Sequence, residues 1–196
     1  MRFQNVGKMG ASLALALSLG LPLLAAGAGS AGSVAGVEST VNWYAPGRVS
    51  TLLRDLQAIN ARLDGYGQTL DTFARSPHYS WQSHAHYLNA VRDEVNGAGK
   101  ILAELQSIRY GALSWQQRAI DRVHPVALDL AAHTEAAIAH VAENQNRLFV
   151  PEYKDHLAAI SDRAAEMKTA VSNFLDYGDA QQKMKTLEQT LEIADS

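Results

Sequence analysis

The chain has 196 residues, of which 17 are Lys or Arg and 20 are Asp or Glu, so its formal net charge is −3. This balance argues against a nucleic-acid partner, because contact with phosphates depends on clustered positive charge. The chain contains no cysteine, which excludes disulfides, thiolate metal sites, iron–sulfur clusters and covalently attached haem. The fold must therefore be stabilised by packing.

Residues 1–28 have the pattern of a secretory signal peptide. Arg2 and Lys8 precede an uncharged run over residues 11–26, which is shorter than the roughly 20 residues that a membrane-spanning helix needs. Ala26-Gly27-Ala28 supplies a cleavage site of the A-x-A type, and Ser33-Val34-Ala35 is a second candidate. We expect a periplasmic or secreted protein.

Cleavage of residues 1–28 would leave no transmembrane domain in the mature chain. Without cleavage, the same segment would remain as an N-terminal membrane anchor. Residues 29–46 contain several Gly and Ser residues and are interpreted as a flexible leader that precedes the folded domain.

Four segments between residues 47 and 178 place apolar residues at steps of three and four, which is the spacing of one face of an α-helix. Breaks fall near Ser76-Pro77, at Tyr110-Gly111 and before Pro151. Because short connections make consecutive long helices antiparallel, the sequence predicts an all-α, up-down-up-down, coiled-coil-like four-helix bundle with a left-handed twist. The residues expected to face inward include Leu56, Tyr66, His84, Leu88, Val91, Ile120, Val123, Thr134, Tyr153, Met167 and Phe174.

The apolar pattern slips in phase at residues 176–179. Beyond this point, residues 179–196 carry a stripe of their own, at Ala180, Met184, Leu187, Leu191 and Ala194. The stripe predicts a short C-terminal amphipathic helix. Such a helix packs on the end of the bundle, continues the preceding helix or binds a partner.

The third predicted helix begins at Ser114-Trp115-Gln116-Gln117, an S-x-x-Q capping box in which the Ser114 hydroxyl and the Gln117 side chain satisfy free backbone N–H groups. With Leu113, these residues are also similar to the L-T-x-x-Q motif of small periplasmic stress chaperones of the Spy and CpxP type. The resemblance covers five residues and has serine in place of threonine. It implies a role in the response to envelope stress.

Three histidines are the candidate ligands of a metal site. When the predicted helices are matched in level, His84 lies beside His140, and His156 lies about one helical turn away. Such a cluster suits Zn, Cu or Ni, or haem held without a covalent link. The alternative interpretation is structural, because a histidine in a core usually hydrogen-bonds a neighbour and flanking histidines usually lie at the solvent edge.

Motifs for the common hydrolases, phosphate-binding loops and di-iron bundles are absent from the sequence. We therefore expect no enzyme and assign no catalytic residue. The leading hypothesis is an exported helical bundle with an interaction, structural or envelope-stress role and an envelope protein as its partner. A periplasmic metal- or haem-binding bundle that uses the histidines is the alternative, and a sensory ectodomain is the third. The sequence does not specify an oligomeric state.

Overall fold

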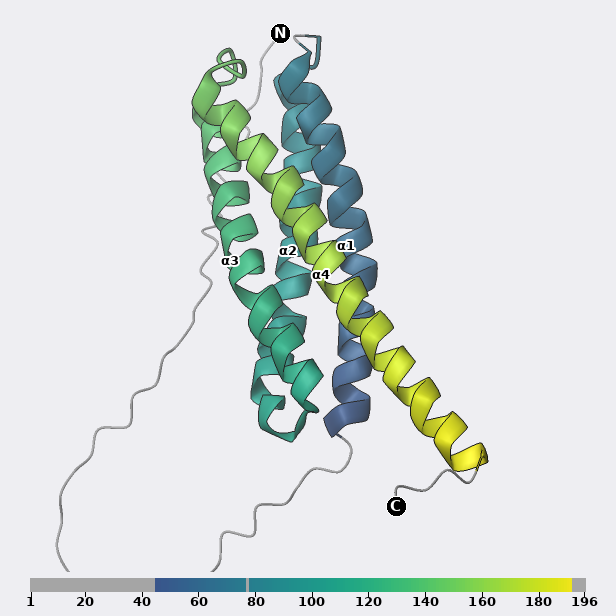
Figure 1. The fold of residues 1–196 in the computed structure, drawn as a ribbon. Coiled ribbons are helices and arrows are strands. Elements are labelled where there is room, and N and C mark those ends of the chain that lie inside the picture. Colours follow the sequence, from purple (N-terminus) through teal and green to yellow (C-terminus); the bar gives the residue numbers. More distant parts are fainter. Residues whose placement is uncertain (1–44, 77, 192–196) are drawn as a thin grey trace, which may run out of the picture. The chain divides into compact units, whose positions relative to one another are not determined.

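A computed structural model describes residues 45–76 and 78–191, which belong to one compact unit. Four long helices make up most of it: α1 (Ala45–Arg75), α2 (Trp81–Ser107), α3 (Ser114–Glu143) and α4 (Pro151–Thr190). A short 3₁₀ helix, η1 (Arg109–Gly111), lies between α2 and α3. The four long helices pack side by side (Figure 1). The prediction of an all-α, four-helix protein is confirmed, and no strand occurs within the described residues.

Each helix packs along two neighbours, so that the core lies between all four. Helices α1 and α3 both pack against α2 and α4, while α1 and α3 scarcely touch each other. The side chains predicted to face inward are buried, except Tyr66 and Phe174, which are half-buried and pack against the core. Near its exit from the bundle, α4 buries Leu175. In the described part of the chain, none of the helices combines the length and the apolar character that crossing a membrane requires.

The start of α1 differs from the predicted domain boundary. Residues 1–44 lie outside the described residues, and with them the predicted signal peptide and most of the leader. The helix already includes Ala45 and Pro46, which were expected to be the last residues of the leader. Ala45 is buried against the bundle, and a proline in the first turn of a helix has no hydrogen bond to lose.

At the end of α4, the structure has the continuation of the preceding helix, which is one of the arrangements expected for the C-terminal residues. Residues 179–190 are helical, but they continue α4 without a break at residues 176–179. Gly178 is the weakest helix former at this point, and one glycine costs about 1 kcal/mol relative to alanine, too little to end a long helix. Residues 192–196 lie outside the described range. Figure 1 shows this last part of α4 extending beyond the ends of the other helices.

The cap of α3 lies one residue earlier than predicted. Leu113 is the N-cap residue, and its backbone N–H donates to Oε1 of Gln116 at 2.9 Å. Gln116 is fully buried, and its Nε2 donates to the Pro46 carbonyl and to Oγ of Ser50 on α1. The glutamine of the cap is therefore Gln116 rather than Gln117, because the burial of Gln116 against α1 fixes the frame of the first turn.

Candidate functional site

His84 lies in the core, where α2 faces α4. Its Nδ1 is 2.8 Å from the hydroxyl of Tyr153, and both side chains are fully buried. The second ring nitrogen, Nε2, is buried with no hydrogen-bond partner. Burial lowers the pKa of His84, because the charged imidazolium loses its hydration. Burial raises the pKa of Tyr153 for the same reason. Near neutral pH the pair is therefore an uncharged hydrogen bond inside an apolar core.

His140 lies against the same tyrosine. Its ring stacks on Tyr153 with the ring centroids 4.7 Å apart and an angle of 18° between the planes. Nε2 of His140 lies 2.9 Å from the carbonyl oxygen of Arg147. Because a carbonyl can only accept, this nitrogen carries the proton. Tyr153 thus contacts both His84 and His140, which were predicted to lie beside each other in the bundle.

His156 pairs with His133, which is not among the predicted metal ligands. Its Nδ1 is 3.0 Å from Nδ1 of His133, so one of the two nitrogens donates to the other. Nε2 of His133 lies 3.7 Å from Oδ1 of Asp129, one turn earlier on α3. The spacing of Asp129 and His133, four residues apart on one helix, was the signal available in the sequence.

The predicted metal ligands are therefore divided between two contacts. His84 and His140 meet at Tyr153, and His156 meets His133. Within the residues that the structure describes, no group of three or more His, Cys, Asp or Glu side chains is placed to hold a metal ion. A metal site at His84, His140 and His156 stays a prediction.

A groove of about 690 Å³ runs between α3 and α4 on the outside of the bundle. Trp115, Phe174 and Tyr177 give it an aromatic lining. At one end, Arg122 donates to Glu166 at 2.8 Å. Arg118 also lines the groove and is exposed, but it makes no ion pair within the described residues. The groove therefore offers an apolar surface beside one uncompensated positive charge.

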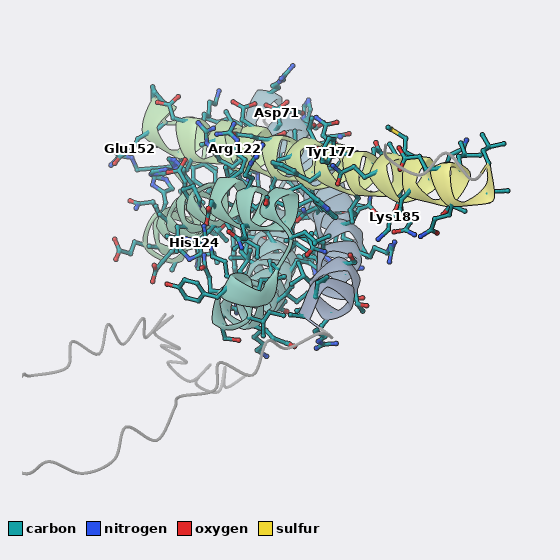
Figure 2. The ribbon with its side chains drawn as sticks, turned by 60° about the horizontal axis from the view of Figure 1, so that its bottom comes forward. Asp71, Arg122, His124, Glu152, Tyr177 and Lys185 are labelled. Atoms are coloured by element: carbon teal, nitrogen blue, oxygen red, sulfur yellow. The ribbon has the colours of Figure 1, made fainter. Side chains whose placement is uncertain are left out.

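Trp115 fixes the place where α4 leaves the bundle. Its indole lies so close to Gly178 that a Cβ atom at this glycine would overlap the ring. The Trp115 and Tyr177 rings meet edge to face, with centroids 6.4 Å apart. Figure 2 shows Tyr177 where α4 reaches the edge of the bundle and Lys185 on the part that extends beyond it.

Beyond this point, every residue of α4 from Asp179 to Thr190 is exposed. Four large apolar side chains are exposed along one face of α4 from Tyr177 onward and at the cap of the helix. They are Tyr177, Met184, Leu187 and Leu191, with exposed fractions of 51%, 61%, 50% and 63%. We call these four residues the α4 stripe. The sequence predicted three of them, and the structure adds Tyr177, which also lines the groove.

Comparison with models of protein families, with curated proteins and with solved structures finds no match to this chain. The likeness of residues 113–117 to the stress-chaperone motif therefore has no longer alignment to support it. Gln117, the glutamine of that motif, donates its Nε2 to the Ala112 carbonyl at 3.0 Å, which is a structural contact next to the start of α3.

Proposed function

We propose that the protein is an exported, non-enzymatic helical bundle that acts by binding another protein through the α4 stripe and the adjoining groove. The observation that carries this proposal is the exposed extension of α4. Every residue of the extension is exposed, whereas helices in proteins take most of their stability from the packing of an apolar face. A partner that covers the stripe would stabilise the extension and remove its apolar side chains from water.

The phase of the stripe supports a partner outside the bundle. Inside the bundle, α4 buries a seam that includes Ala164 and Val171. The same seven-residue step from Val171 leads to Gly178 and Lys185, which carry no apolar side chain. The stripe instead includes Tyr177 and Met184, one residue earlier. One residue is about 100° around a helix, so the stripe faces a different direction from the core seam.

We also propose that the bundle has the up-down-up-down, antiparallel topology with a left-handed twist that its sequence predicts. Two ion pairs support the antiparallel order of α1 and α2. Arg48, near the start of α1, contacts Glu104 near the end of α2, at 2.6 Å. Arg62, in the middle of α1, contacts Glu94, also at 2.6 Å. The seven-residue spacing of the core is the pattern that produces a left-handed twist.

The proposed location is the periplasm or the medium, on the basis of residues 1–28. Expression of the full chain followed by N-terminal sequencing of the exported product tests this part. We expect the mature protein to begin after Ala28 or Ala35. A product that keeps Met1 and stays in the cytosol would contradict export.

The interaction role is tested in cells by photo-crosslinking. A photo-reactive phenylalanine analogue replaces Leu187 in the stripe, and the matched control replaces Leu128, an exposed leucine on α3 that does not line the groove. We expect a discrete protein adduct from position 187 and none from position 128. The absence of adducts from position 187, and likewise from position 184, would overturn the proposed role.

A second candidate function, the binding of a transition metal, is favoured by one contact. His133 and His156 bring two Nδ1 atoms to 3.0 Å, and Asp129 faces the other nitrogen of His133. A carboxylate behind a histidine is the usual support of a histidine ligand. Calorimetric titration with Zn²⁺, Cu²⁺ and Ni²⁺, and haem titration followed at the Soret band, test it. We expect His156→Ala to abolish metal binding; a wild-type protein that binds none of these ligands would exclude this function.

A further inference from the structure

We propose that the partner of the groove and the α4 stripe is a second copy of this chain. In this arrangement, the distal part of the α4 extension from each copy, residues 184–191, lies in the groove of the other, about a twofold axis. The inference rests on the proposed interaction function and names its partner.

The two surfaces match in length. Along α4, the groove extends from Glu166 to Tyr177, and the exposed extension runs from Asp179 to Thr190. Each stretch contains 12 residues and is therefore about 18 Å long at 1.5 Å per residue. About the twofold axis given below, residues 184–191 of each copy lie level with groove positions 170–177 of the other, and residues 179–182 of the two copies lie level with each other.

The two surfaces are also continuous. Tyr177 lines the groove and begins the stripe, so both lie on the same side of α4. A second α4 that packs antiparallel against the stripe therefore also lies along the groove. When the twofold axis passes between Ala180 and Gln181, Tyr177 lies level with Met184 of the second copy.

The same register pairs apolar residues further along the groove. Phe174 lies level with Leu187 of the second copy, and Ala170 lies level with Leu191 of the second copy. Both Phe174 and Ala170 line the groove. The apolar side chains of Met184, Leu187 and Leu191 thus meet the part of the groove between positions 170 and 177, which is what a buried helix–helix contact requires.

Charge supports this register independently. Trp115 contacts Gly178 and Arg122 contacts Glu166, so Arg118, between them on α3, lies near the level of Asn173. The register places Glu188 of the second copy at this level. Neither Arg118 nor Glu188 makes an ion pair within the described part of the chain. The dimer would give each of them a partner of opposite charge.

The twofold arrangement makes each contact twice. Each copy contributes its extension of 12 residues and the nine residues that line its groove. Tyr177 is the junction between them. Extension and groove together supply at most 21 residues per copy, which is the lower end of the roughly 20–30 residues a side of a standard protein–protein interface, and an isologous interface closes without open ends.

The test uses the mature chain and its association, measured by sedimentation equilibrium. We expect a monomer–dimer equilibrium for the wild type. Arg118→Glu and Glu188→Arg should each weaken dimerisation at least tenfold, and the double variant R118E/E188R should recover most of the loss. The matched controls are Lys100→Glu and Glu135→Arg, exposed charges on α2 and α3 outside the groove, which should leave dimerisation unchanged. Circular dichroism verifies that every variant remains folded.

The outcomes separate this inference from the proposed function. A wild-type protein that stays monomeric at high micromolar concentration, or single charge reversals without effect on a dimer, would overturn the reciprocal groove arrangement. Crosslinking from position 187 in cells then shows whether the interaction function itself holds. An adduct with a different protein would retain the interaction function and reject the second copy, whereas the absence of any adduct would reject both.

Discussion

The hydroxyl of Tyr153 lies 2.8 Å from Nδ1 of His84, and this is a hydrogen bond between two fully buried side chains from α2 and α4. Helices α2 and α4 lie diagonally across the bundle and share no close backbone contact. The bond therefore links two helices that otherwise meet only through the apolar core. A buried polar pair of this kind specifies which residues lie at the same level, which apolar contacts alone do less strictly.

Removal of the tyrosine hydroxyl should destabilise the bundle. In Tyr153→Phe, both nitrogens of His84 are buried without a partner, since Nε2 already has none. We expect a loss of about 1–3 kcal/mol in the free energy of unfolding, measured by urea denaturation at pH 7. The control is Tyr110→Phe, which alters an exposed tyrosine and should have no effect. Equal stability of Tyr153→Phe and the wild type would contradict the role of the bond.

His84 should also make the fold sensitive to mild acid. Its pKa in the folded state is lowered from the ordinary value of 6.5, so the unfolded chain binds the proton more readily. The contribution of neutral His84 is therefore complete above about pH 6.5 and is lost as the pH falls from 6.5 toward the lowered pKa. His84→Leu cannot take up this proton. We expect its unfolding free energy to fall less than that of the wild type between pH 7 and pH 5, and parallel curves would exclude His84 as the cause.

Much of the fold was predictable because burial on a helix follows a simple period. The steps of three and four identified Leu88, Val123 and even the polar His84 as inward residues, and all three are buried. The period does not fix which residues on neighbouring helices come within 3 Å of each other. His156 was therefore matched with His84 and His140, although the structure pairs it with His133.

The candidate interaction surface was predictable only in part, for a related reason. Met184 and Leu187 belong to a stripe that the sequence shows, but the change of phase at Gly178 did not reveal whether the helix stops there. Arg118 carries no local sequence signal at all. Arg118 stands out only in the structure, where the nearby Arg122 pairs with Glu166 and Arg118 has no ion-pair partner within the described residues.

Two glycines in α1 should respond in opposite ways to the same substitution. A Cβ atom at Gly67 would lie 2.9 Å from the Cα of Ser161, so Gly67→Ala forces the backbones of α1 and α4 apart. Nothing lies within 4 Å of a Cβ atom at Gly65, so Gly65→Ala gains only helix propensity. We expect Gly67→Ala to lower the unfolding free energy by about 1–3 kcal/mol and Gly65→Ala to raise it by about 1 kcal/mol.

Thermal and urea denaturation of both alanine variants check this pair. The two positions are two residues apart on one helix, so the difference between them reports the close approach of α4 rather than a general effect on α1. A Gly67→Ala variant as stable as Gly65→Ala would show that α1 and α4 are not in contact at Ser161.

Loss of either partner of the Asp64–Lys168 ion pair should lower the stability of the fold by a different amount. Lys168 donates to Oδ2 of Asp64 at 2.6 Å, and the aspartate is almost buried whereas the lysine is about half exposed. This hydrogen bond lowers the pKa of Asp64 from its ordinary value of 3.8, against the opposing effect of burial. Lys168→Met leaves a carboxylate with little access to water, while Asp64→Asn leaves an ammonium group that solvent can hydrate.

We therefore expect Lys168→Met to cost about 1–2 kcal/mol at pH 7 and more than Asp64→Asn costs. Because the folded pKa of Asp64 is lowered, the stability that this pair contributes is present above the ordinary pKa and is lost as the pH falls through the lowered one. The difference in unfolding free energy between the wild type and Lys168→Met should then decrease below about pH 4. Urea denaturation at pH 7 and at successively lower pH measures it, and a difference that is absent at pH 7 would show that the pair contributes nothing to folding.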